Sequence, residues 1–162
     1  MGLLRWLVRI VVGLVALFAL VFFGARLHDG PLGPIPGGSL QAGELVSHEV
    51  PSWSFVRDVD EIELQLDSQQ RSRTTWIFVL DDKAYVPCSL GFPPGKSWYK
   101  EAAVDGRAIL RIEGQRYPVM LTKLDDEAAR QMSEAARAEL TRKYGQLPSS
   151  ENGAWIFEVT SR

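Results

Sequence analysis

The pattern of hydrophobic and polar positions begins with a long apolar run near the N-terminus. No charged residue occurs from Ile10 to Ala25, and apolar residues extend the run back to Trp6. The run approaches the roughly 20 residues that span a hydrocarbon core of about 30 Å. It is longer than a typical signal-peptide core, and no A-x-A-like pair of small residues closes it. We therefore predict an uncleaved transmembrane anchor over residues 1–27, with a cleaved signal peptide and a buried core helix as alternatives.

The charges that flank this run predict its orientation. Arg5 and Arg9 precede the run, whereas only Arg26 follows it closely. Cytoplasmic flanks of membrane spans carry the excess of Lys and Arg. We therefore expect a single-pass protein of the cell (inner) membrane with a cytoplasmic N-terminus and a periplasmic or other extracytoplasmic domain, so that the lipid bilayer is its first partner.

A Gly/Pro-rich juxtamembrane segment follows over residues 28–52. Its first part reads HDGPLGPIPGGSLQAG, in which the prolines and glycines disfavour helix. The segment is either a plain spacer or, because it contains Leu32, Ile35 and Leu40, an arm that packs on the domain or lies at the bilayer surface. We interpret His28 and Asp29 as ordinary loop residues.

The hydrophobic pattern from Trp53 onward predicts β-strands joined in hairpins. Apolar and polar residues alternate over 61–66, as expected of a half-buried strand. The run Thr74–Leu80 is continuously β-branched or apolar, which favours one strand buried on both faces. Turn residues then predict two hairpins, the first joining 74–80 to 84–87 and the second joining 107–112 to 116–121.

Two helices and a last strand complete the pattern. We predict a short helix over 97–104, a long helix over 126–144 and a strand over 155–159. Asp125 is the expected N-cap of the long helix, Gly145 its C-terminal glycine and Pro148 the residue that prevents it from resuming. Its expected apolar stripe is Ala128, Met132, Ala135, Ala136, Leu140 and Tyr144, and its expected surface ion pairs are Arg130/Glu134 and Glu139/Lys143.

This order of elements predicts an α+β fold. A mostly antiparallel sheet with one short and one long helix can close into a small barrel. We therefore divide the chain into the anchor, the juxtamembrane segment and a split-barrel domain over residues 53–162.

Composition and charge exclude several classes of function. A net charge of −2 with interleaved acidic and basic residues argues against a nucleic-acid partner. A single cysteine, Cys88, forms no intrachain disulfide, and with two histidines the chain shows no spacing for a metal site. The segment from Gly91 to Ser97 is one residue too short for a phosphate-binding P-loop. We interpret Cys88 as a small buried hydrophobic residue rather than a redox thiol.

A set of short motifs resembles a known family. Arg73-Thr74-Thr75 opens an apolar strand, Ser89 ends the next strand, and Trp98-Tyr99 precedes Asp105 and Gly114 at matching intervals. This pattern resembles the deazaflavin-dependent nitroreductase and quinone-reductase family, whose split β-barrel is related to that of the flavin-binding pyridoxamine-phosphate oxidases. The resemblance implies the same split-barrel fold here.

The resemblance also implies a cofactor site. In that family a glycine- and lysine-rich segment before R-T-T, and the lysine of S-K-G-G, hold the cofactor phosphates; here residues 67–72 contain no glycine and Leu90 replaces the lysine. The remaining cations could form a smaller anion site, and Trp98 and Tyr99 could stack on a flavin-like ring or simply pack in the barrel. The implied cofactor-binding residues are Arg71, Arg73, Thr74, Thr75, Ser89, Lys96, Trp98 and Tyr99.

Two functions remain open from the sequence. The first is a membrane-anchored reductase that binds deazaflavin or FMN and acts on a quinone-like or nitro acceptor. The second is a cofactor-free binding or accessory subunit of a larger membrane protein complex, in which the partner is another integral membrane protein or a homodimer mate. No catalytic residue can be named for the first, and neither function requires a metal.

Overall fold

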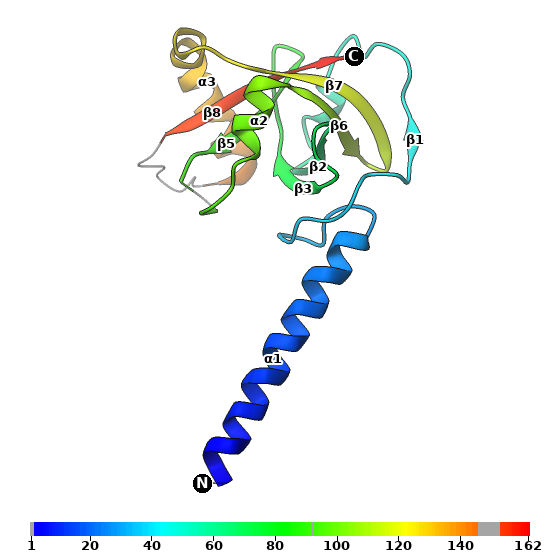
Figure 1. Cartoon of the computed structure of the whole chain (residues 1–162). Coiled ribbons are helices and arrows are strands. Elements are labelled where there is room, and N and C mark those ends of the chain that lie inside the picture. The colour runs from blue at the N-terminus through cyan, green and yellow to red at the C-terminus, as the bar shows by residue number, and fades with distance from the viewer. Residues whose placement is uncertain (1, 92, 146–152) are drawn as a thin grey trace.

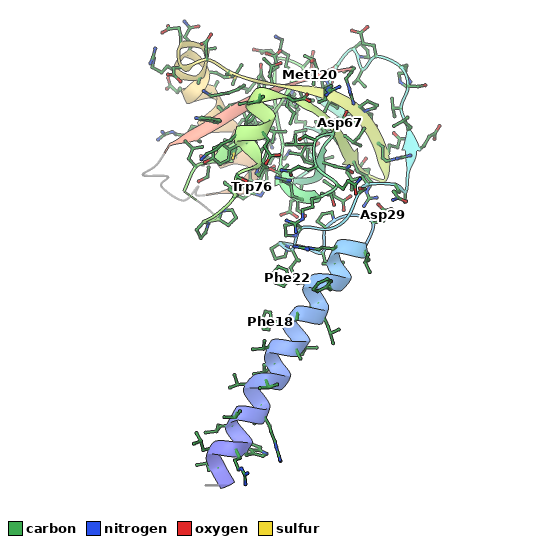
Figure 2. The ribbon with its side chains drawn as sticks, in the orientation of Figure 1. Phe18, Phe22, Asp29, Asp67, Trp76 and Met120 are labelled. Atoms are coloured by element: carbon green, nitrogen blue, oxygen red, sulfur yellow. The ribbon has the colours of Figure 1, made fainter. Side chains whose placement is uncertain are left out.

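The N-terminal helix stands apart from the rest of the chain. We analysed a computed structural model that describes residues 2–91, 93–145 and 153–162, and in it α1 (Gly2–Leu27) projects from a β-rich body (Figure 1). The helix has 26 residues and a mean hydropathy of 2.6, and Ala25 is the residue of α1 that is buried. Phe18 and Phe22 project from it into open space (Figure 2). A helix of this length and composition can cross a bilayer or serve as a signal sequence.

Eight strands of the described chain form one curled sheet (Figure 1). The strands are β1 (Glu44–Leu45), β2 (Glu61–Leu66), β3 (Ser72–Trp76), β4 (Phe78–Leu80), β5 (Lys83–Ser89), β6 (Arg107–Ile112), β7 (Gln115–Lys123) and β8 (Ala154–Ser161). Their order is β3-β2-β6-β7-β8-β5-β4, and β1 pairs with β7 outside this path. All the pairs are antiparallel except β1 with β7. The predicted α+β class and mostly antiparallel barrel are confirmed.

The sheet curls because its two ends are consecutive in the chain. β3 lies at one end of the strand order and β4 at the other, and Ile77 is the residue between them. The concave side encloses one hydrophobic core that includes the fully buried Leu64, Leu110, Val119 and Phe157. The curl therefore lets a small sheet bury its inner face against itself.

The prediction of one continuous strand over residues 74–80 is wrong. β3 pairs with β2, whereas β4 pairs with β5, so the run changes partners at Ile77. The backbone of Ile77 then lies outside the sheet ladder and needs other partners, because it is buried. Tyr144 Oη accepts from Ile77 N at 3.2 Å, and Lys143 Nζ donates to Ile77 O at 2.8 Å. The end of the long helix thus completes the corner of the barrel.

The helices confirm most of their predicted bounds. Besides the short turn η1 (Ser54–Val56), the domain contains α2 (Trp98–Val104) and α3 (Asp126–Tyr144). The Asp125 carboxylate caps α3 by accepting from Ala128 N at 2.7 Å. The predicted C-terminal Gly145 has φ +74°, which glycine adopts without strain. Pro148 lies outside the described residues.

Two details of α3 differ from the prediction. Ala136 and Leu140 are buried against Phe78 and Tyr85, but Ala135 is exposed, because the helix presents a narrower face to the sheet than the stripe implied. The expected Glu139/Lys143 pair does not form. Glu139 instead accepts from Arg142 at 2.7 Å, and Lys143 Nζ donates to the carbonyl of Ile77, which also accepts from Tyr144 Oη at 2.9 Å.

The juxtamembrane segment is a packed arm and not a spacer. Gly37 N donates to Ser72 O at 3.0 Å, so the arm pairs with the edge of β3, and residues 44–45 form β1 beside β7. Leu40 is buried. Of the alternatives that the sequence left open, packing on the domain is the one observed for residues 28–45.

Candidate functional site

One polar cluster lies around Arg73, at the inner side of β3. We define the Arg73 cluster as Gln69, Arg73, Cys88, Trp98 and Glu101. β3 places Arg73 opposite Leu64 of β2, and its guanidinium carbon lies 5.5 Å from the centroid of the Trp98 ring. A guanidinium at this distance from an aromatic face gains a cation–π attraction. The arginine of the R-T-T motif is therefore directed at the tryptophan of the Trp-Tyr motif.

The hydrogen bonds of the Arg73 cluster are incomplete. Arg73 Nη2 donates to Gln69 Oε1, and Gln69 Nε2 donates to Glu101 Oε2 at 2.5 Å. Gln69 thus connects the cation to the carboxylate of α2. Arg73 Nε is buried and has no hydrogen-bond partner among the described residues. A buried donor without an acceptor is costly, so this atom is a place where an added acceptor would be favourable.

Burial governs the electrostatics of this cluster. Burial lowers the pKa of Arg73 to about 10, although the charge of Glu101 acts in the opposite direction. Arg73 therefore remains a cation at neutral pH. Burial also raises the pKa of the Cys88 thiol, with Lys96 and Arg73 opposing it, and the side chain is 2% exposed. The interpretation of Cys88 as a buried hydrophobic residue is consistent with this burial, because a reactive thiol is an accessible thiolate.

The two aromatic residues of the predicted site are packed against other rings. Trp98 is 7% exposed, and its ring centroid lies 5.7 Å from that of Phe157. Tyr99 meets Trp155 edge to face at 5.1 Å. Both contacts are of the kind that stabilises cores. Trp98 therefore belongs to the hydrophobic core of the barrel, and Tyr99 packs against that core.

The other predicted site residues are divided between this cluster and its surroundings. Lys96 lies near enough to Cys88 to hydrogen bond with it, and Ser89 ends the same strand, β5. Arg71 is exposed at the start of β3, and Thr75 pairs with Ile62 of β2. Thr74 Oγ1 donates to Gly33 O in the arm at 2.9 Å. The structure thus brings Arg73 and Lys96 close to Cys88 and Trp98 close to Arg73, while Thr74 bonds to the arm.

These residues fit a flavin-type cofactor only in part. Arg73 Nε could donate to an anionic group, which suits a phosphate. The ring of Trp98, however, is already covered by the Arg73 guanidinium and contacts Phe157. A flat cofactor ring could stack there only after displacing these groups, so the arrangement does not fit a flavin ring.

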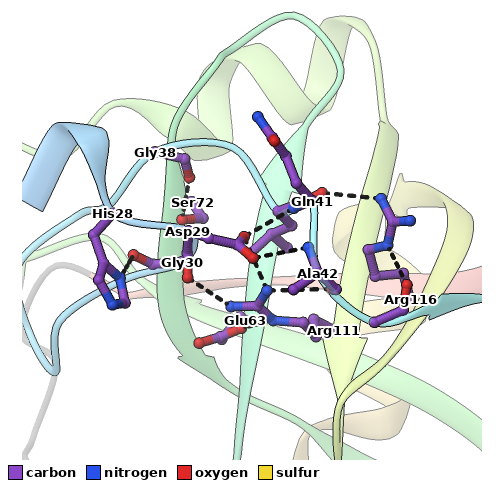
Figure 3. Close-up of polar contacts among 12 residues, drawn as sticks. His28, Asp29, Gly30, Gly38, Gln41, Ala42, Glu63, Ser72, Arg111 and Arg116 are labelled. Carbon is purple, nitrogen blue, oxygen red and sulfur yellow. Dashed lines mark hydrogen bonds and ion pairs between the residues drawn. The ribbon is translucent and has the colours of Figure 1, made fainter.

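A second polar cluster joins the arm to the barrel (Figure 3). We define the latch as Asp29, Glu63 and Arg111. Arg111 Nε donates to Glu63 Oε2, Nη1 donates to Asp29 Oδ1 at 3.0 Å, and Nη2 donates to the backbone oxygen of Asp29 at 3.0 Å. The Arg111 side chain is 13% exposed. One arginine of β6 therefore bonds a carboxylate of β2 and a carboxylate of the arm.

The Asp29 side chain also organises the arm itself. Its two oxygens accept from Gln41 N at 2.8 Å and Ala42 N at 2.7 Å (Figure 3). Arg116 Nε donates to Gly43 O at 3.0 Å, just before β1 begins. These bonds close residues 29–42 into a loop that is held against β6 and β7.

The latch favours its charged state. Burial acts to raise the pKa of Asp29, but the hydrogen bonds from Gln41, Ala42 and Arg111 outweigh it and hold that pKa below its usual value. Burial likewise acts to lower the pKa of Arg111, but Glu63 and Asp29 outweigh it and raise that pKa. Both shifts mean that the folded chain favours the charged forms of Asp29 and Arg111 more than water does.

A groove lies on the surface formed by residues 44–52. Its volume is about 400 Å³, and it is lined by residues 44–48, 50–52, Phe55, Gln115 and Tyr117. Phe55 and Tyr117 pack with Trp53, with ring centroids 5.7–5.8 Å apart. None of the eight predicted cofactor-binding residues lines this groove.

The sequence does not predict the latch or two of the five members of the Arg73 cluster. Asp29 was interpreted as a loop residue, and Glu63, Gln69, Glu101 and Arg111 were given no role. A charged residue inside the alternating strand 107–112 is the one available signal for Arg111, and it looks like a solvated position in the pattern. Only the packing of the arm reveals that it is mostly buried.

Comparison with known proteins adds little beyond the fold. No protein-family model matches the chain, and no curated protein matches it. Among solved structures the chain is similar to a NimC/NimA family protein from Clostridium acetobutylicum, with a TM-score of 0.42 and 14% identity, covering 67% of this chain and 78% of that chain. This similarity assigns no ligand and no activity to the chain.

Proposed function

We propose that the chain is a membrane-anchored split-barrel protein that works as a binding or accessory subunit of a larger membrane protein complex. The observation that supports this proposal most directly is the Arg73 cluster. Arg73 covers Trp98 and is tied through Gln69 to Glu101, so the predicted cofactor position is filled by the chain's own side chains. Because the chain's own side chains fill this position, we expect a partner to bind on the surface of the barrel.

The junction between α1 and the arm supports an uncleaved anchor. Gly38 N donates to His28 O at 2.9 Å, just beyond the end of the helix. A Cβ at Gly38 would lie 2.7 Å from Arg26 O, so the arm passes directly over the last turn of α1. Ala25 is fully buried. Removal of α1 would therefore break contacts that the folded arm makes.

The orientation of the anchor follows from the arginines that flank it. With Arg5 and Arg9 before the span, we propose that the barrel lies on the extracytoplasmic side of the cell membrane. A reporter that is active only in the cytoplasm, fused after Arg162, should be inactive, and a reporter that requires export should be active. The reverse result would overturn this orientation.

The groove of residues 44–52 is the surface that we propose for a partner. Val46 and Val50 are half-buried beside the aromatic Phe55 and Tyr117, and such apolar and aromatic surface is typical of protein contacts. We propose that an extracytoplasmic segment of another integral membrane protein lies there. A photoactivatable residue at the exposed, groove-lining His48 should crosslink to one discrete membrane protein, and one at the exposed Lys100 of α2 should not. Equal crosslinking from both positions would contradict this proposal, and a crosslinked homodimer would replace it with a second copy.

A cofactor titration tests the choice between binding subunit and enzyme. Detergent-purified protein should be colourless, and added FMN or deazaflavin should not raise its melting temperature. A chromophore bound in equimolar amount, and lost when Arg71 and Arg73 are both changed to Ala, would overturn the proposal.

A second candidate function is a deazaflavin- or FMN-dependent reductase of a quinone-like or nitro acceptor. The unpartnered Nε of Arg73 favours it, because an anionic group of a ligand would supply the missing acceptor. The Arg71, Arg73 double variant described above is the matching test: if this candidate is correct, it must abolish cofactor binding while a variant of the exposed Arg107 leaves binding intact.

A further inference from the structure

An apolar hairpin lies at the beginning of the arm. Leu32 N donates to Ile35 O at 3.0 Å and Ile35 N donates to Leu32 O at 3.1 Å, which closes a tight turn at Gly33 and Pro34. The side chains of Leu32, Pro34 and Pro36 are exposed, with Leu32 at 40%. No charged residue occurs from Gly30 to Gly43. The exposed surface of this hairpin is therefore apolar and uncharged.

The hairpin offers few backbone donors that need water. Three of its six residues, over 31–36, are prolines and have no N–H. The N–H groups of Leu32 and Ile35 are bonded within the turn. Five of the six residues thus present no free backbone N–H, and the carbonyls of Leu32, Gly33 and Ile35 accept hydrogen bonds, which lowers the desolvation cost of placing this segment in an apolar environment.

The chain places this hairpin beside the end of the anchor. Leu27, the last residue of α1, is 90% exposed, and the hairpin begins four residues later. Thr74 donates to Gly33 O, and Gly37 pairs with Ser72, so the hairpin is fixed to β3. In Figure 1 the arm lies between the end of α1 and β3. When α1 spans a bilayer, this side of the barrel faces the membrane.

We propose that the exposed surface of residues 32–36, together with Leu27, inserts into the boundary between headgroups and acyl chains of the outer leaflet. The inference rests on the transmembrane anchor of the proposed function. Its consequence is that the barrel has one fixed orientation on the membrane, because the latch of Asp29, Glu63 and Arg111 ties the inserted arm to the sheet. We infer that the surface around the hairpin is lipid for two reasons. The hairpin lies next to the end of the apolar helix α1, and it carries no charged group that could bind a protein partner selectively.

Depth-dependent quenching of a fluorescent label tests the insertion. Leu32→Cys carries the label in a Cys88→Ala background, and the full-length protein is reconstituted in vesicles of phosphatidylcholine and phosphatidylglycerol. Leu45→Cys in β1 is the matched control, because Leu45 is also an exposed leucine, at 48%, and the strand β1 lies farther from the end of α1 than β3 does in Figure 1. Lipids with a shallow nitroxide should quench the label at position 32 severalfold more than the label at position 45. Equal quenching at both positions would overturn the insertion.

A third label separates failure of the insertion from failure of the anchor. Val15→Cys lies in the middle of α1 and should be quenched by lipids with a deep nitroxide. Strong quenching at position 15 with none at position 32 would leave the anchor standing and refute the insertion. Absence of quenching at both positions would refute both. In addition, Leu32→Asp should reduce quenching of a label at Pro34→Cys, whereas Leu45→Asp should not.

Discussion

Arg111 and Arg73 are both shielded from solvent, but the acceptors around their guanidinium groups differ. Arg111 is surrounded by carboxylates, and each nitrogen of its guanidinium donates to an acceptor, so its pKa is raised despite burial. Arg73 has one amide acceptor for Nη2 and none among the described residues for Nε, and burial lowers its pKa. Arg111 has the acceptors expected of an arginine that stabilises the fold, whereas Arg73 keeps a buried donor without an acceptor among the described residues.

The two arginines differ in how far their partners offset the cost of burying a charge. A buried charge is tolerated when its partners balance the desolvation cost, and the latch meets this condition. The Arg73 cluster meets it only in part, and a ligand or a partner could complete it. Substitutions in the latch, in the arm that it holds and at Arg73 should therefore differ in their cost to stability.

Arg111→Ala should destabilise the fold most. It leaves the carboxylates of Asp29 and Glu63 close together with no cation, and the arm loses its main attachment. Loss of one member of a fully buried ion pair costs about 3 kcal/mol or more; because Asp29 and Glu63 are 33% and 28% exposed, we expect a loss of about 2 to 3 kcal/mol here. Denaturant unfolding of the detergent-solubilised protein measures this loss. Arg107→Ala on the same strand is the control, because its pair with Asp105 is exposed and should contribute less than about 1 kcal/mol. Equal losses in the two variants would show that the latch is not structural.

Gly37→Ala should detach the arm by steric conflict. A Cβ at this position would lie 1.7 Å from Gly30 O, which no small shift relieves. Overpacking of this kind costs about 2 kcal/mol. Hydrogen exchange of the Ser72 amide, which donates to Gly37 O, should become faster. Gly24→Ala in α1 meets no atom within 4 Å and should leave that exchange unchanged; slow exchange in both variants would show that the arm is not held by this contact.

Acidification should weaken the latch through Asp29. The folded-state pKa of Asp29 is lowered, so its contribution is fully present above the usual value of 3.8 and is lost as pH falls through the folded-state value. Asp29→Asn should therefore cost about 1 kcal/mol at neutral pH. The difference between wild type and variant, measured by denaturant unfolding at a series of pH values, should vanish at the acidic end. A difference that does not depend on pH would rule out ionised Asp29 as the cause.

Arg73→Met should have the smallest effect on stability. The change removes the Nε donor, which has no partner among the described residues, and one hydrogen bond from Nη2 to the neutral amide of Gln69, and it leaves an apolar side chain against Trp98. We therefore expect a loss of no more than about 1 kcal/mol. The same unfolding measurement applies. A loss as large as that of Arg111→Ala would mean that Arg73 is a structural residue, and the contrast between the two arginines would be lost.

The local elements were the best-predicted part of the fold. The bounds of α3 and its cap at Asp125 follow from capping preferences and from the 3.6-residue period, which depend on neighbours in the chain. The division of residues 74–80 at Ile77 could not be predicted, because both halves are apolar and β-branched or aromatic. Only the closure of the sheet sends one half to β2 and the other to β5.

The candidate site shows the same limit. The sequence motifs identified Arg73, Trp98 and Tyr99, but they could not show that Arg73 would cover the tryptophan ring.

What the sequence by itself determined is the apolar N-terminal helix, the α+β class and the order of strands and helices, since these depend on length, periodicity and turn residues. The tertiary structure alone decided that the Gly/Pro-rich segment is a packed arm and that Asp29, Glu63 and Arg111 form its latch. The physical reason is that these three residues are separated by 34 and 48 positions in the chain. Their charges become partners only when the curled sheet and the arm bring them within hydrogen-bonding distance and exclude most of the water around Arg111.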